Sequence, residues 1–304
     1  MNFFAIFTAL LLEHARPLGD GSLAQANTRL WIRRVQHWLD AGQLPHAWVA
    51  WLLAVGAPAL LSALVYGVLS YFSLLLAFAW LVVVLYLTVG LRQFSARFMV
   101  VREALEAGDE VRAHAALAAW QQLDISEVQR PQLLRQTVEY AVLAAHRHVF
   151  GVLACFVVFA ALGLGPAGAV AYHMAVHVRR AWHFSATGST SSDVLQRVAA
   201  QAWHWLDYLP ARATALAFAV VGNFEEAIAS WRQEAHRFTD ANEGVVLAAT
   251  SGALHVRLGE SGVVFDDGRE PQLLHLASVM GLVWRSVVLW LMVMALMWLA
   301  RVVH

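Results

Sequence analysis

Two histidines in the middle of the chain have a spacing that suits a metal site. His173 and His177 stand four residues apart and therefore share one face of a helix, where two imidazoles could meet a metal ion or a haem. No aspartate or glutamate lies within 167–186, and Arg179 and Arg180 would repel a cation. We therefore predict no metal site. Instead we expect both histidines to be polar anchors at a membrane–water boundary.

A second set of residues is cationic. His146, Arg147 and His148 precede an apolar stretch, and Arg179 and Arg180 follow it. Together they could hold a phosphate or the head group of an anionic lipid. The alternative is topological, because arginines gather at the cytoplasmic ends of membrane segments.

Arg212 is a further candidate for a ligand-binding residue. It follows Pro210 in a mostly apolar stretch, so its guanidinium needs a partner or an aqueous cavity. Asp207 and Asn242 are the expected partners. Asp207 has an alternative role, which is to cap a helix that we expect to break at 209–212.

The elements that must position these residues are membrane helices. Trp48 to Leu69 and Tyr71 to Leu91 are uncharged and long enough to cross a bilayer, which takes roughly 20 residues. Val279 to Leu299 is a further span, and Met1 to Leu12 is a short helix packed against the spans or re-entrant. The sequence predicts an all-α, polytopic helical integral membrane protein with about 4–5 membrane segments and a cytoplasmic helical hairpin.

The stretch from Val149 to Val176 leaves two alternatives open. It is apolar but contains Gly163, Gly165 and Pro166. One long kinked span would place its two arginine flanks on opposite sides. A re-entrant pair of half-helices would keep both flanks on one side, as the charge rule prefers.

The domain organisation follows from the charges beside the spans. Residues 28–40 form an amphipathic helix with Arg29, Arg33 and Arg34 at the membrane surface, and arginines also follow the second span. We predict a single membrane domain over 1–304. Within it, 92–148 is a cytoplasmic helical insertion broken at Gly108, whose last helix runs from about Pro131 to His148. The region 178–278 is mostly cytoplasmic or interfacial and helical; Asn223 caps one of its helices, and 261–271 is a polar loop.

Composition supports these predictions and excludes some chemistry. Hydrophobic residues make up 60% of the chain and charged residues 14%, against about 25% in soluble proteins. All 21 basic residues are arginines, so a Walker-A lysine and a Schiff base are excluded. The formal net charge of zero argues against a nucleic-acid partner. The single cysteine, Cys155, has no partner in the chain for a disulfide.

Two motifs resemble those of the CobD/CbiB family. Tyr208-Leu-Pro-Ala-Arg212 is similar to that family's YLPARL element, and Ser251-Gly-Ala-Leu-His-Val-Arg-Leu-Gly259 is similar to its AGALGVRLGG element. Asn242 stands where the family has an asparagine. The resemblance implies a membrane enzyme of cobalamin biosynthesis, the adenosylcobinamide-phosphate synthase that attaches the aminopropanol arm. It singles out Arg212 and Arg257 as binding residues.

The chain also departs from the family's motifs. Positions where the family has acidic residues fall here on 144–151, on 175–180 and on Trp203 and His204. Those carboxylates would hold Mg²⁺ against a nucleotide's phosphates. Their replacement predicts a weakly active or inactive protein. Glu13, Arg180-Ala-Trp182 and Trp205-Leu-Asp207 resemble AmpE proteins, so the alternative is a non-catalytic membrane modulator linked to β-lactamase induction or cell-wall stress.

The sequence leaves open whether the chain is an enzyme. Its ligand-binding candidates are seven residues: Arg212, Arg257, Asn242, Asp207, Arg147, Arg179 and Arg180. No cofactor is evident, and a corrinoid substrate with Mg-nucleotide is implied only if the family's activity is retained. The expected partners are the lipid bilayer, a corrinoid or another phosphorylated small molecule, and a membrane protein or a second copy of the chain. The expected location is the bacterial inner (plasma) membrane, crossed several times.

Overall fold

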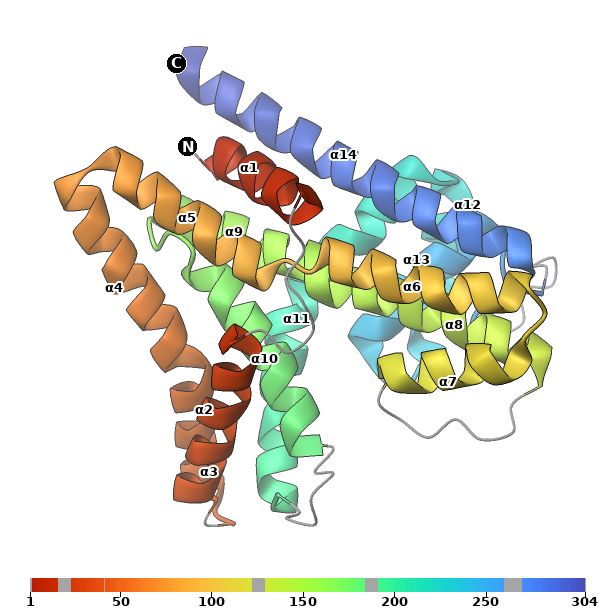
Figure 1. Cartoon of the computed structure of the whole chain (residues 1–304), viewed down its shortest axis with the longest axis horizontal. Helices are drawn as coiled ribbons and strands as arrows, with labels where there is room; N and C mark the ends of the chain where they lie inside the picture. Colours follow the sequence, from red (N-terminus) through yellow and green to blue (C-terminus); the bar gives the residue numbers. More distant parts are fainter. Residues whose placement is uncertain are drawn as a thin grey trace. The chain divides into compact units, whose positions relative to one another are not determined.

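A computed structural model describes residues 2–15, 23–40, 42–121, 129–183, 191–259 and 270–303 of the chain (Figure 1). These residues form helices and connecting segments, with no strand among them. Four of the helical segments are long and apolar enough to cross a membrane: Leu44–Phe72, Leu74–Glu106, Arg130–Ala161 and Leu273–Ala300. The prediction of an all-α, multi-pass membrane protein is confirmed.

The helices belong to two compact units. Unit 1 contains Met1–Gly90 and Arg147–Pro210, and unit 2 contains Leu91–His146 and Ala211–His304. The chain therefore passes from one unit to the other after Gly90, His146 and Pro210. Whether 92–148 and 178–278 lie on the cytoplasmic side stays a prediction.

Unit 1 is built around a helical hairpin. Its helices are α1 (Asn2–Ala15), α2 (Leu23–Leu39), α3 (Leu44–Trp51), α4 (Ala57–Phe72), α5 (Leu74–Thr88), α9 (Gly151–Ala161) and α10 (Ala167–His183), with the π-helices η1 (Leu52–Gly56) and η2 (His146–Phe150). α4 and α5 pack together, and the Trp80 indole donates to the Ser62 carbonyl at 3.1 Å. α1 packs on α5, as one alternative for the first twelve residues predicted.

The turn between α9 and α10 decides how 149–176 is organised. Gly163 and Gly165 have φ angles of 81° and 56°, a region that glycine enters without strain, and α9 and α10 pack against each other. A side chain at Gly168 would overlap the Cys155 carbonyl, so the two helices approach closely at this glycine. The chain turns back at the Gly–Pro cluster, as the second alternative predicted, and one kinked span through Val176 is wrong.

The helix before this turn is longer than predicted. We expected a helix to end near His148, but α8 (Arg130–Ala145) continues through η2 into α9, so that Arg130–Ala161 is one helical segment. Apolar packing on both sides of His146 accounts for this. His146 is itself buried and bonded rather than a polar end of the helix.

Unit 2 surrounds one buried helix. Its helices are α6 (Leu91–Glu106), α7 (Glu110–Gln121), α8, α12 (Phe224–Glu234), the 3₁₀-helix η3 (Ala235–Arg237), α13 (Ala241–Leu254) and α14 (Leu273–Val303). α13 packs against α8, α12 and α14 and is buried at every position from Gly244 to Ala253. The predicted break at Gly108 and the predicted cap at Asn223 are both confirmed, since Asn223 accepts a hydrogen bond from the Glu226 backbone.

α11 (Asp193–Val221) corrects a second prediction. We expected the helix to break at 209–212, but α11 runs through Pro210 without interruption. Proline removes one backbone hydrogen bond and need not end a long apolar helix, because packing of the residues after it keeps the chain helical. Ala211, Ala215 and Phe218 follow Pro210 and are all buried.

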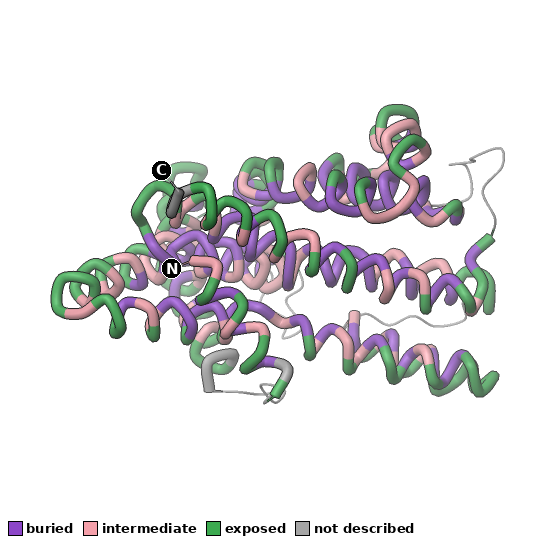
Figure 2. The backbone as a smooth tube through the Cα atoms, turned by 90° about the horizontal axis from the view of Figure 1, so that it is seen from above, coloured by how far each residue is buried: buried purple, intermediate pink, exposed green. Residues whose placement is uncertain are grey.

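Large apolar side chains remain exposed along α4, α5 and α14 (Figure 2). Examples are Leu64 at 66%, Leu75 at 75% and Val288 at 61% of full exposure. A surface of this kind suits a bilayer. The predicted polar loop at 261–271 lies outside the described residues except for its last two positions.

Candidate functional site

The first turn of α13 holds the guanidinium of Arg212. Asp240 caps this helix by accepting hydrogen bonds from the backbone N–H groups of Asn242 and Glu243, at 2.9 and 3.2 Å. Asn242 is thereby fixed at a fully buried position. Its Oδ1 accepts a hydrogen bond of 3.1 Å from Arg212 on α11. The expected partnership of Arg212 with Asn242 is confirmed. Because Asn242 is neutral, this hydrogen bond does not neutralise the guanidinium.

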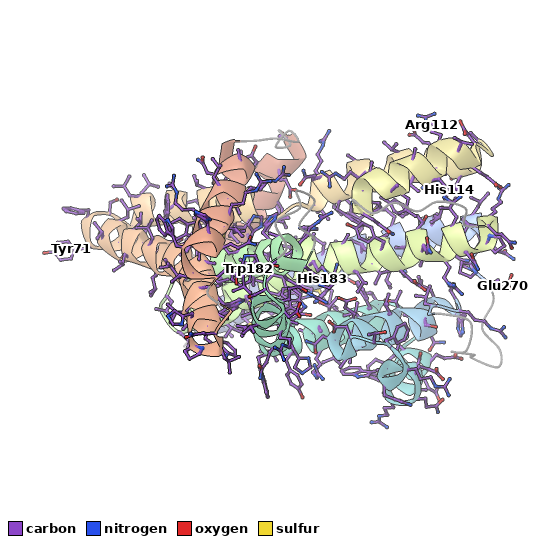
Figure 3. All side chains as sticks on the ribbon, turned by 90° about the horizontal axis from the view of Figure 1, so that it is seen from below. Tyr71, Arg112, His114, Trp182, His183 and Glu270 are labelled. Atoms are coloured by element: carbon purple, nitrogen blue, oxygen red, sulfur yellow. The ribbon has the colours of Figure 1, made fainter. Side chains whose placement is uncertain are left out.

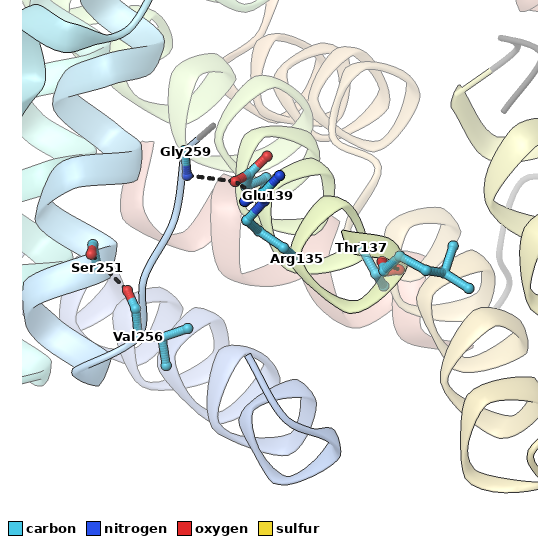
Figure 4. Close-up of polar contacts among 7 residues, drawn as sticks. Arg135, Thr137, Glu139, Ser251, Val256 and Gly259 are labelled. Atoms are coloured by element: carbon cyan, nitrogen blue, oxygen red, sulfur yellow. Dashed lines mark hydrogen bonds and ion pairs between the residues drawn. The ribbon is translucent and has the colours of Figure 1, made fainter. Parts of the chain in front are cut away.

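The segment that carries Arg257 is fixed at both of its ends (Figure 4). Ser251 Oγ donates to the Val256 carbonyl at 2.6 Å, which ties the start of the segment to the last turn of α13. The Gly259 N–H donates to Glu139 Oε1 on α8, also at 2.6 Å. Arg257, which is half-buried, therefore lies on a short segment whose backbone has little freedom.

Glu139 is a residue whose role sequence reasoning missed. Its carboxylate also lies 3.8 Å from the Arg135 guanidinium on the same helix. One signal could have identified it, because Glu139 is the only acidic residue between Arg130 and Ser192. A single carboxylate in so long an apolar stretch needs a partner, and here a backbone N–H 120 residues away is one.

His255 has an unusual backbone at the end of α13. Its φ of 52° and ψ of 41° are left-handed, and it is the only described residue other than glycine with a positive φ. The family element that this segment resembles has glycine here. Two contacts hold the imidazole: Nε2 lies 3.2 Å from Asn223 Nδ2, and Nδ1 lies 3.2 Å from Glu226 Oε2.

Asp207 lies in unit 1, at a buried position on α11. Tyr172 on α10 donates its hydroxyl to Asp207 Oδ1 at 2.7 Å. The ring of Tyr172 covers Gly151, where any side chain would overlap it. The alternative role of Asp207 as a helix cap is wrong, because α11 has no break there.

Apart from His146, which belongs to unit 2, the predicted cationic set belongs to unit 1. Arg147 lies in η2, and Arg179 and Arg180 lie near the end of α10, all three half-buried. The Arg179 guanidinium stands 5.5 Å from the ring centre of Trp203, which in turn packs on Tyr172. The structure therefore assigns Arg147, Arg179, Arg180 and Asp207 to one unit, and Arg212, Asn242 and Arg257 to the other.

His173 and His177 share one face of α10, as their spacing predicted. Their ring centres are 4.6 Å apart. Within the described parts of the chain, no group of three histidine, cysteine, aspartate or glutamate residues is arranged to hold a metal ion.

Two of the replaced acidic regions are packed into the interior. His146 is fully buried, and its Nδ1 lies 2.9 Å from Thr214 Oγ1 on α11. Trp203 is also buried, and its ring centre lies 5.2 Å from that of Tyr172. The side chains of His146 and Trp203 themselves offer no carboxylate oxygen to a hard cation. The carboxylate next to Trp203 in these contacts is that of Asp207, which accepts the Tyr172 hydroxyl.

Comparison with known proteins gives a consistent result. The family model described as CobD/Cbib protein matches residues 19–277. A protein of Stutzerimonas stutzeri (strain A1501) named cobalamin biosynthesis protein CobD is 30% identical over 309 residues, which cover 96% of each chain. The protein of the same name from Chromobacterium violaceum is 32% identical over 186 residues, which cover 59% of this chain and 54% of that one. No solved structure matches the chain.

Proposed function

This chain belongs to the CobD/CbiB family, and on that premise we propose that it acts in cobalamin biosynthesis at the inner membrane. The proposed step joins a carboxylate of adenosylcobyric acid to the amine of the aminopropanol arm. A nucleoside triphosphate supplied as co-substrate activates the carboxylate, so the amide bond forms as the C–O bond breaks and that oxygen leaves on phosphate. The single observation that carries the proposal is the orientation of Arg212 in the YLPAR motif by the buried Asn242.

Arg212 suits the binding of an anionic substrate group. A guanidinium presents donors in a planar fork that matches a phosphate or a carboxylate. Asn242 orients the fork through a neutral oxygen, which fixes the direction of the guanidinium without neutralising it. Arg257, on the segment fixed by Ser251 and Glu139, is the second proposed binding residue.

The residues at the replaced positions do not suit Mg²⁺. Of the family's acidic regions, one holds the buried His146 bonded to Thr214 and another holds the buried Trp203. A magnesium–nucleotide complex needs carboxylate oxygens. We therefore assign no step to a metal ion, and we propose that the chain has weak synthase activity.

The test is formation of the amide by the purified full-length protein, measured by mass spectrometry with adenosylcobyric acid, phosphorylated aminopropanol and ATP with Mg²⁺ as co-substrate. We expect slow product formation by the wild-type chain. Arg212→Lys keeps the charge but loses the fork, so KM for one substrate should rise about tenfold or more.

Asn242→Asp is the matched variant. Its carboxylate would pair with Arg212 and compete with an anionic substrate, so activity should fall although the arginine is still held in place. Arg112→Gln on α7 is a control, since Arg112 is exposed and belongs to no predicted site. An Asn242→Asp variant as active as the wild type would contradict this role of Arg212.

The second candidate is a non-catalytic, AmpE-like modulator, and the replaced acidic positions favour it. It predicts no product from the wild-type chain at any substrate concentration. It also predicts a changed β-lactamase induction when the gene is deleted, which the synthase proposal does not.

A further inference from the structure

α2 carries arginines on its exposed side and contains no acidic residue. Ile32 and Val35 are buried and attach the helix to the rest of unit 1. Arg29, Arg33 and Arg34 are exposed. Because Arg29 and Arg33 are four residues apart, their side chains leave the helix on the same face.

A hydrogen bond fixes where these arginines lie along the neighbouring apolar stretch. The Trp31 indole donates to the Ala54 carbonyl at 3.2 Å. Arg29 and Arg33 lie two residues to either side of Trp31, which is about 3 Å along the helix axis. They therefore stand beside η1 (Leu52–Gly56), near the start of the apolar stretch that begins at Trp48.

Exposed apolar side chains surround this position. Leu30 on α2 is 63% exposed, and Val49 and Leu52 on the neighbouring segment are 53% and 57% exposed. Arginines next to exposed leucine and valine are typical of the boundary between lipid head groups and acyl chains.

α10 adds a further cation from a second helix. It packs against α2, as Figure 1 shows, and it contains no acidic residue. Burial lowers the pKa of His177 well below its usual range, and Arg180 and Arg29 are among the neighbouring cations that lower it further. Arg180 of α10 and Arg29 of α2 thus act on the same imidazole. Trp182 and His183 mark the end of α10 in Figure 3.

The acidic residue that follows α2 is bonded to a backbone N–H of another segment. Asp40 follows α2, and its Oδ2 accepts a hydrogen bond of 3.0 Å from the Ser192 backbone N–H. Asp40 is seven residues beyond Arg33, or about 10 Å along a helix axis. The positive charge of Arg29 and Arg33 is therefore not compensated from within α2, α3 or α10.

We propose that Arg29 and Arg33 of α2, together with Arg180 of α10, bind the phosphate of an anionic phospholipid such as phosphatidylglycerol. The guanidinium groups meet the phosphate at head-group level, and Leu30 and Leu52 contact the start of the acyl chains. These three arginines lie in unit 1, whereas Arg212 belongs to unit 2.

Native mass spectrometry of the detergent-solubilised full-length protein tests the proposal. The protein is titrated with phosphatidylglycerol and, separately, with phosphatidylcholine. The wild type should bind phosphatidylglycerol selectively. The double variant Arg29→Gln/Arg33→Gln should bind it roughly 30-fold more weakly, since each arginine near an anionic head group contributes about a fivefold factor. Its affinity for phosphatidylcholine should not change.

Two further variants separate charge from folding. Arg29→Lys/Arg33→Lys keeps both charges and should retain most of the selectivity, whereas the control Arg112→Gln on α7, labelled in Figure 3, should bind as the wild type does. Equal binding of phosphatidylglycerol by the wild type and the Gln double variant would overturn the proposal. Displacement of the lipid by millimolar inorganic phosphate would also overturn it, because the site would then serve a free anion.

Discussion

The left-handed residue at the end of α13 gives the sharpest prediction on stability. His255 ends the helix with its N–H directed to the Ser251 and Gly252 carbonyls, at φ 52° and ψ 41°. For a residue with a Cβ this conformation costs about 1 kcal/mol or more, and glycine avoids that cost. The imidazole contacts to Asn223 and Glu226 offset it in this chain.

These energies predict the order of stability of two variants at position 255. His255→Ala keeps the backbone strain and loses a hydrogen bond of about 1 kcal/mol and an exposed ion pair of about 0.5 kcal/mol, so it should lower the free energy of unfolding by about 1.5 kcal/mol. His255→Gly loses the same contacts but releases the strain, so it should fall within about 0.5 kcal/mol of the wild type.

Thermal unfolding of the solubilised protein measures this order. Ala115 supplies a control with the opposite sign, because it is exposed in the middle of α7, where glycine is about 1 kcal/mol worse than alanine. Glycine should therefore be better than alanine at position 255 and worse at position 115. An alanine variant at 255 that equals or exceeds the glycine variant would refute the reasoning.

Three other substitutions test the packing of unit 1 and the continuity of α11, each by thermal unfolding. Gly151→Ala should destabilise the protein by about 1–3 kcal/mol, because the added methyl overlaps the buried ring of Tyr172; an unchanged midpoint would mean that the ring can move aside. Tyr172→Phe should cost about 1.5–3 kcal/mol through the lost hydrogen bond to the Asp207 carboxylate, and a neutral result would contradict that bond. Pro210→Ala should raise the free energy of unfolding by up to about 3 kcal/mol, and with it the thermal midpoint, since it restores a helical hydrogen bond within α11; a lower midpoint would show that the proline is needed.

The sequence predicted those features that depend on local pattern. Apolar length identified the spans of α4, α5 and α14, and the residue types at Gly108 and Asn223 identified a helix break and a helix cap. The apolar length of a span and the residue type at a helix cap are local properties, so the sequence alone shows them.

Features that depend on distant contacts were missed or mistaken. Pro210 and His148 were expected to lie at helix ends, but packing of the residues around them keeps the backbone helical at both. The role of Glu139 depends on Gly259, which is 120 residues away, and no local pattern pairs them. The partner of Arg212 was predictable because the two motifs suggested that Arg212 and Asn242 belong to one site.

Genetic complementation tests the central claim most directly. The chain is expressed in a strain that lacks its own CobD/CbiB enzyme and must make cobalamin from cobyric acid. The account predicts slow growth that is lost with Arg212→Ala and with Arg257→Ala and kept with Arg112→Ala. Absence of growth with the wild-type protein present in the membrane, or growth that both alanine variants support equally well, would contradict it.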